Sequence, residues 1–238
     1  QGQDATLDKL DRLAVSRLQI DSEKVAFMTG KDPQTRTAYR VETDRLVLRC
    51  WSPADATVLR AALDACDAHL RPMIPFMKDE PRSLQETAQW LRGHRSAFDL
   101  GTMYRYAVFD AEEQNLLGEN MLLARVGPGG LEIGYWTHKD TVGKGIATEA
   151  SSAMIRVAFE IEKVNRVEIM CAPQNLASAS IPARLGFTHE ATLKKRALDS
   201  EGGIQDLMVW SLFADDYPSS PAAGITIRAF DCLGESII

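Results

Sequence analysis

The chain has 238 residues and a formal net charge of −6; hydrophobic residues make up 45% of it and charged residues 25%. This balance is typical of a globular protein and excludes wholesale disorder, collagen and coiled coil. No apolar run approaches the roughly 18 residues of a membrane span, so we expect no membrane partner. No basic stripe interleaved with aromatics is present, so we expect no nucleic-acid partner.

The N-terminal residues are predicted to form an extension. Apolar residues at helical spacing over 4–19 predict a short amphipathic helix, which packs either on its own domain or against a second copy in a homodimer. The polar stretch 30–38 is predicted to be a linker. We therefore divide the chain into an extension (1–38), a main domain (39–217) and a C-terminal tail (218–238).

The main domain is predicted to mix strands and helices. Residues 45–49 alternate as a strand does, and Ser52 with Pro53 then begins a helix. After a loop over 70–79, Ser83 and Glu86 form a capping box that opens a helix running to about Phe98. Further strands are expected at 104–109, 116–126, 131–137, 166–172, 190–198 and 204–213, with helices from the loop 141–147 to about 163 and at 175–185. The tail contains a short alternating run, 225–230, with the potential of an edge strand.

Cysteine usage indicates the cellular setting. The spacings of Cys50, Cys66, Cys171 and Cys232 match neither a zinc pattern nor a disulfide framework. We expect free thiols, a cytoplasmic location and no metal. The N-terminal residues show no signal-peptide pattern.

The most informative stretch is the glycine-bearing loop before the helix at 147. Glycines 143 and 145 let backbone N–H groups approach an anion closely, and the helix N-terminus adds unpaired N–H groups. These features predict a pyrophosphate cradle, to which Lys144 adds a cation and Thr148 a hydroxyl. Neither the P-loop nor the dinucleotide pattern fits, because Gly145 follows Lys144 and position 148 is not glycine.

Four segments in order resemble the GNAT superfamily of acetyl-CoA-dependent N-acetyltransferases, and within it the RimJ/RimL-like branch. The match extends over about 39–217 and rests on 43–49, 131–136, 143–150 and 175–187 with its Asn175-Leu176-Ala177-Ser178 opening. The resemblance implies an α/β (α+β) fold: a mixed, mostly antiparallel central sheet with a splayed parallel strand pair, flanked by helices.

The resemblance also implies acetyl-CoA as co-substrate, without a metal. Pantetheine would enter between strands 131–138 and 166–172, and the pyrophosphate would lie on the amides of 142–147. The implied cofactor-binding residues are Tyr135, Trp136, Thr137, Val142, Gly143, Lys144, Gly145, Ile146, Ala147, Thr148 and Asn175.

Two catalytic roles follow from the resemblance. Ser178 would donate a hydrogen bond to the departing sulfur, although Pro182 should kink its helix and re-aim it. Glu132 is the first candidate base for the protonated amine, Glu119 the second and Glu80 the third. His138 lies at a strand end, far from the expected thioester.

The acceptor is expected to be a primary amine, either a protein N-terminus or a small molecule. Loops 70–81 and 199–203 should shape its site, where Asp79 and Glu80 would favour a cationic acceptor. The alternative function is a catalytically inactive acyl-CoA-binding sensor or scaffold.

Overall fold

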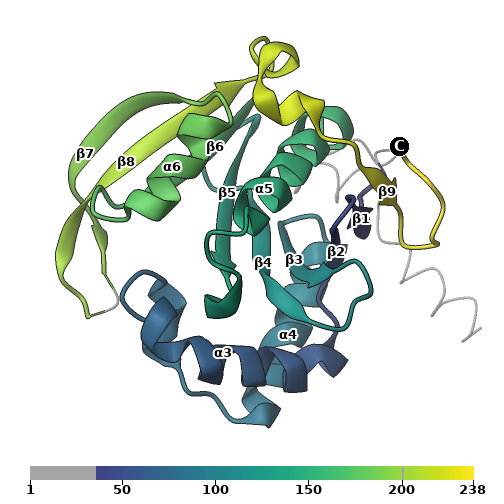
Figure 1. Ribbon diagram of the computed structural model, residues 1–238, viewed down its shortest axis with the longest axis vertical. Helices are drawn as coiled ribbons and strands as arrows, with labels where there is room; N and C mark the ends of the chain where they lie inside the picture. The colour runs from purple at the N-terminus through teal and green to yellow at the C-terminus, as the bar shows by residue number, and fades with distance from the viewer. Residues whose placement is uncertain (1–35, 200) are drawn as a thin grey trace, which may run out of the picture. The chain divides into compact units, whose positions relative to one another are not determined.

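The computed structural model describes residues 36–199 and 201–238, and residues 36–238 form one compact unit (Figure 1). The helix expected at 4–19 and most of the 1–38 extension lie outside the described residues.

The unit is built on one sheet of nine strands in the order β7-β8-β6-β5-β4-β3-β2-β1-β9. Every neighbouring pair is antiparallel except β5 and β6, which are parallel. The strands are β1 (Arg40–Glu42), β2 (Leu46–Cys50), β3 (Met103–Asp110), β4 (Leu116–Leu123), β5 (Gly130–Thr137), β6 (Arg166–Cys171), β7 (Thr188–Leu198), β8 (Ile204–Phe213) and β9 (Arg228–Phe230). This topology confirms the expected fold class.

Helices cover both faces of the sheet (Figure 1). On one face, α3 (Ala56–Leu70) packs against α4 (Leu84–Asp99), and α3 buries Leu59, Leu63 and Leu70 at helical spacing. On the other face lie α5 (Ile146–Arg156) and α6 (Leu176–Arg184), whose buried side chains belong to a second hydrophobic cluster. The active-site elements therefore stand on a sheet that is packed on both sides.

The helix expected to extend to residue 163 is α-helical over only part of that length. α5 ends at Arg156, and Val157–Ile161 forms a π-helical turn in which the Glu162 N–H donates to the Val157 carbonyl at 2.9 Å. This turn buries four of its five side chains.

The C-terminal segment is part of the folded unit rather than a separate tail. β9 pairs with β1 at the edge of the sheet, and Ala222 and Ala229 are fully buried. The last residues then fold back, with the Ile237 N–H donating to the Ala229 carbonyl at 2.7 Å. Residues 236–238 therefore pair with the edge strand β9, and the division at 218 stays a prediction.

Candidate active site

The parallel strands β5 and β6 separate partway along their length. Their last paired residues are Ile133 and Ile169, and beyond this point β5 continues to Thr137 paired with β4. Two clefts, of about 460 and 450 Å³, meet at this opening. The residues that line both are Met73, Ile74, Tyr135, Trp136, Asn175 and Ser178.

The first cleft contains the glycine loop. Gly143 and Gly145 have φ values of 78° and 79°, the left-handed region that other residues rarely adopt. Gly145 is the N-cap of α5, so the amides that follow it lack helical partners and face an anion site. The residues of the loop and first turn that line this cleft are Val142, Gly143, Gly145, Ile146, Ala147 and Thr148. This cradle fits a pyrophosphate, whereas Lys144 contributes its backbone rather than cleft surface.

Arg45 fixes this loop, a role that the sequence analysis missed. Its Nη1 donates to the Lys144 carbonyl at 3.2 Å, and its Nε donates to Glu149 of α5 at 2.7 Å. The Thr43 hydroxyl donates to the same Glu149 at 2.6 Å. A long-range contact between the start of β2 and the first turn of α5 thus holds the cradle, and nothing in local sequence spacing reveals it.

We expect Arg45→Ala to weaken coenzyme A binding by about 3–10-fold, because the loop loses this clamp. Isothermal titration measures the change. Arg228→Ala, which removes a surface arginine paired with Glu42 instead, is the control. An unchanged dissociation constant for Arg45→Ala would show that the loop backbone holds the cradle alone.

Two further basic side chains, His69 at the end of α3 and Arg184 at the end of α6, also line the first cleft. They come from elements far apart in sequence.

Ser178 stands where the two clefts meet, and its surroundings explain how Pro182 is accommodated. Asn175 caps α6 by accepting the Ser178 N–H at 3.1 Å. Pro182 has no N–H to donate to the Ser178 carbonyl, and the Tyr135 hydroxyl occupies that place at 3.1 Å. The same hydroxyl lies 3.0 Å from Ser178 Oγ. Burial raises the pKa of Tyr135, so the phenol stays protonated beside the serine.

Glu132 is the candidate carboxylate that lines the second cleft. Its side chain is 7% exposed and accepts two hydrogen bonds from Arg125, at 2.6 and 2.5 Å. Glu168 of β6 is its partner in the strand register, but Glu168 binds Arg166 and does not line the cleft. Glu132 therefore combines a buried position, a place on the wall of the second cleft and a bound arginine.

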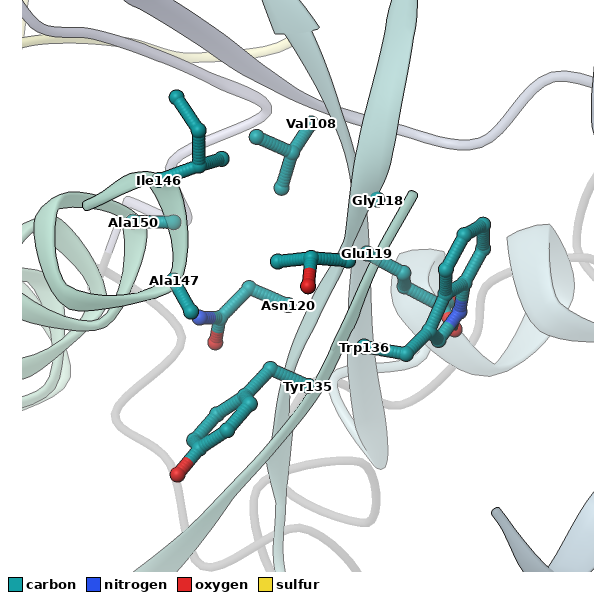
Figure 2. A pocket seen from close by; sticks show the side chains of 10 residues that line it. Val108, Gly118, Glu119, Asn120, Tyr135, Trp136, Ile146, Ala147 and Ala150 are labelled. Carbon is teal, nitrogen blue, oxygen red and sulfur yellow. Dashed lines mark hydrogen bonds between the residues drawn. The ribbon is translucent and has the colours of Figure 1, made fainter. Parts of the chain in front are cut away.

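Glu119 has a different environment. Its oxygens accept from Trp51 Nε1 at 2.7 Å, from Arg105 Nε and Nη2 at 2.8 and 2.5 Å, and from Trp136 Nε1 at 3.0 Å. Figure 2 shows Glu119 and Trp136 on one side of the sheet and Asn120 and Tyr135 on the side of α5. Burial raises the pKa of Glu119, but the charge and hydrogen bonds of Arg105 outweigh it and lower the pKa. With all four donors in place, Glu119 anchors Trp136 and is a poor base.

The remaining candidates lie outside both clefts. Glu80 is buried and paired with Arg60 and Arg82, so it does not give the acceptor mouth its expected negative charge, and Asp79 faces Arg82 at 3.5 Å. His138 accepts the Asp140 N–H at the start of a short turn. Loop 70–81 lines the second cleft through Met73, Pro75 and Phe76, and residues flanking 199–203, Leu198 and Gln205, line it as well.

Within residues 36–199 and 201–238, no helix has the length and hydropathy to cross a membrane. Over the same residues, His, Cys, Asp and Glu side chains form no group of three that could hold a metal ion.

Comparisons with known proteins identify relatives in sequence and in fold. The chain is 40% identical to the Bacillus subtilis protein YdaF over 36% of its own length, and spans 46% of that relative. It is 28% identical to the [ribosomal protein uS5]-alanine N-acetyltransferase of Escherichia coli, covering 75% of this chain and 92% of the relative.

A solved structure of RimL, an L7/L12 α-N-protein acetyltransferase in complex with coenzyme A, has the same fold. It superposes with a TM-score of 0.66 at 21% identity, over 72% of this chain and 95% of that one. The model of the acetyltransferase (GNAT) domain matches residues 45–188. The match spans the cradle, the strand opening and the Asn175 cap, and the chain belongs to this family of N-acetyltransferases.

Proposed function

We propose that this protein transfers the acetyl group of acetyl-CoA to the primary amine of a protein N-terminus, by direct attack on the thioester. One observation carries the proposal: the cradle cleft and a separate apolar cleft meet at Ser178 and Trp136, in the gap between β5 and β6. Cofactor and acceptor can thus approach one point from opposite sides. The name of the Escherichia coli relative and the coenzyme A in RimL support the choice of substrates.

The residues at the opening between β5 and β6 would have different chemical roles. Pantetheine would run along the unpaired edge of β5 at Tyr135, Trp136 and Thr137, so that a backbone N–H near Trp136 meets the developing oxyanion. Glu132 would receive the amine proton through the acceptor cleft. Ser178 would donate to the departing sulfur, while Tyr135 holds the Ser178 carbonyl through its hydroxyl.

The neighbouring thiol favours direct attack over an acyl-cysteine route. Cys171 lines the acceptor cleft, and burial raises its pKa. The thiol therefore stays protonated and is a weak nucleophile beside Ser178.

The acceptor cleft suits a peptide with variable side chains. Its apolar wall includes four methionines, Met73, Met103, Met121 and Met170, whose flexible side chains adapt to different neighbours. We also retain a homodimer and a cytoplasmic location as predictions, the second supported by four free cysteines among the described residues.

The test combines binding and turnover. Acetyl-CoA at about 100 times its dissociation constant should stabilise the protein by roughly 2.7 kcal/mol in thermal unfolding. Free coenzyme A thiol should form when a peptide with a free N-terminus is added, and should not form with the same peptide blocked at its N-terminus. Stabilisation without turnover on any amine would favour the sensor or scaffold, and no stabilisation would contradict the proposal.

Ser178→Ala should lower kcat by about 10–100-fold and leave acetyl-CoA affinity within twofold, because it removes the donor to the leaving sulfur. Ser180→Ala is the matched control: Ser180 lines the same cleft on the same helix, but its hydroxyl donates to the Ala177 carbonyl at 2.8 Å. Equal kcat values for the two variants would remove Ser178 from the mechanism.

A further inference from the structure

The acceptor cleft contains an ion pair that the acceptor must disturb. Glu132 is almost fully buried, whereas the Arg125 side chain is 65% exposed, and both line the cleft. Arg125 donates to both oxygens of Glu132. An amine with a pKa near 8 arrives mostly as the ammonium ion at neutral pH. It therefore meets a carboxylate whose oxygens already hold a cation.

Glu132 needs a cation for as long as it is ionised. A buried carboxylate left without its partner is costly, and Glu168 lies opposite Glu132 in the strand register. Arg166 compensates Glu168, donating from Nε at 2.6 Å, and it also donates to the Val126 carbonyl. The acceptor ammonium is thus expected to exchange with Arg125 rather than bind after Arg125 has left.

The displaced arginine then has no counterion in the cleft. Among the described residues that line it, the charged ones are Arg105, Arg125 and Glu132. Arg105 is buried and held by both oxygens of Glu119, so it neither moves nor offers a negative charge. Arg125 is exposed and lies in the turn after β4, where its long side chain can swing at small cost.

We propose that Arg125 selects acceptors that carry a carboxylate close to the reacting amine. The acceptor ammonium replaces Arg125 on Glu132, and Arg125 turns to the acceptor carboxylate, so that two ion pairs take the place of the one between Arg125 and Glu132. This inference rests on the proposed acetyl transfer. The carboxylate comes either from an acidic side chain near a peptide N-terminus or from the α-carboxyl group of a free amino acid.

Acceptor pairs that differ in one charge test the exchange. With acetyl-CoA, we compare kcat/KM for a C-terminally amidated peptide beginning Ala-Glu with the same peptide beginning Ala-Gln, and include free alanine and its amide. In the wild type, kcat/KM should be about tenfold higher for the acidic member of a pair, because its KM is lower. A preference in the peptide pair indicates an acidic side chain as the source of the carboxylate, and a preference in the alanine pair indicates an α-carboxyl group.

Arg125→Ala and Arg125→Gln should bring the acidic-to-neutral ratio close to one by raising KM for the acidic acceptor. Lys194→Ala is the control for overall charge, since Lys194 is 82% exposed on the neighbouring hairpin and pairs with Asp206 outside the cleft; it should keep the ratio. A wild type without preference, or an Arg125 variant that keeps it, would overturn the inference while leaving acetyl transfer established. If no amine is acetylated, the proposed function itself fails.

Discussion

Glu119→Gln should lower the free energy of unfolding by about 3–5 kcal/mol, the cost of breaking a buried ion pair from one side. Four N–H donors from Trp51, Arg105 and Trp136 converge on its two oxygens. A glutamine replaces one oxygen with an NH₂ group that faces two of these donors and leaves Arg105 with an unpaired buried charge. For a unit of this size, the midpoint should fall by roughly 10 °C.

The same network should make stability depend on pH in a defined direction. Because the folded pKa of Glu119 lies below its ordinary value, its contribution is present above the unfolded pKa and is lost as the pH falls through the folded pKa. Burial and the charge of Arg105 lower the pKa of His94 to about 4, so His94 also costs stability between its unfolded pKa and about pH 4. Both groups therefore weaken the fold in acid.

Chemical denaturation at pH 7, at pH 5 and at about pH 3 measures these effects: between pH 7 and pH 5 the loss comes mainly from His94, and below pH 5 it comes from Glu119 as well. Glu235→Gln is the control, because Glu235 is 68% exposed and pairs with Arg36 at the surface, where such pairs contribute little. A loss below about 1 kcal/mol in Glu119→Gln would show that the network does not stabilise the fold.

Local patterns in the sequence were sufficient to predict the elements of the site. The glycine loop before α5 and the Asn175 cap of α6 follow from backbone conformation and capping, which depend on neighbouring residues. The opening between β5 and β6 came only from the family resemblance, since periodicity does not show where two strands cease to pair.

The partners of the candidate carboxylates could not be predicted in this way. Glu119 meets Arg105 because the register of β3 and β4 brings them to one face, and that register depends on an irregularity at Val108 and Phe109. Gly118 is required there, since a Cβ would lie 2.2 Å from the Trp136 carbonyl oxygen. The sequence ranked Glu132 ahead of Glu119 and Glu80 but did not show their partners, and only strand pairing separates Glu119, a structural anchor, from Glu132, which lines the second cleft.

The long-range contact that replaces the hydrogen bond lost at Pro182 could not be predicted from the sequence either. The sequence indicated that Pro182 would leave the Ser178 carbonyl without a helical donor, and predicted a re-aimed serine. The hydroxyl of Tyr135, which supplies that donor, comes from a strand more than 40 residues earlier in the chain. The alternating run 225–230 did indicate an edge strand, and β9 lies within it, but the sequence did not show that its partner is β1.

Glu132→Gln should lower kcat by about 100–1,000-fold if Glu132 takes the proton from the amine, the usual size of a general-base contribution. Acetyl-CoA affinity should stay within twofold, because Glu132 lines only the acceptor cleft. The fold should lose less than about 1 kcal/mol, since the released Arg125 is largely in water.

Glu168→Gln is the matched control for this substitution. It makes the same chemical change in the neighbouring strand at the paired register position, but Glu168 binds Arg166 and does not reach the cleft. Its kcat should stay within threefold of wild type. Raising the pH from 7 to 9 should restore part of the Glu132→Gln activity, because solvent then deprotonates the amine. A kcat within threefold of wild type for Glu132→Gln would mean that water rather than Glu132 removes the proton, whereas a large loss without recovery at high pH would mean that the carboxylate orients the amine and does not act as its base.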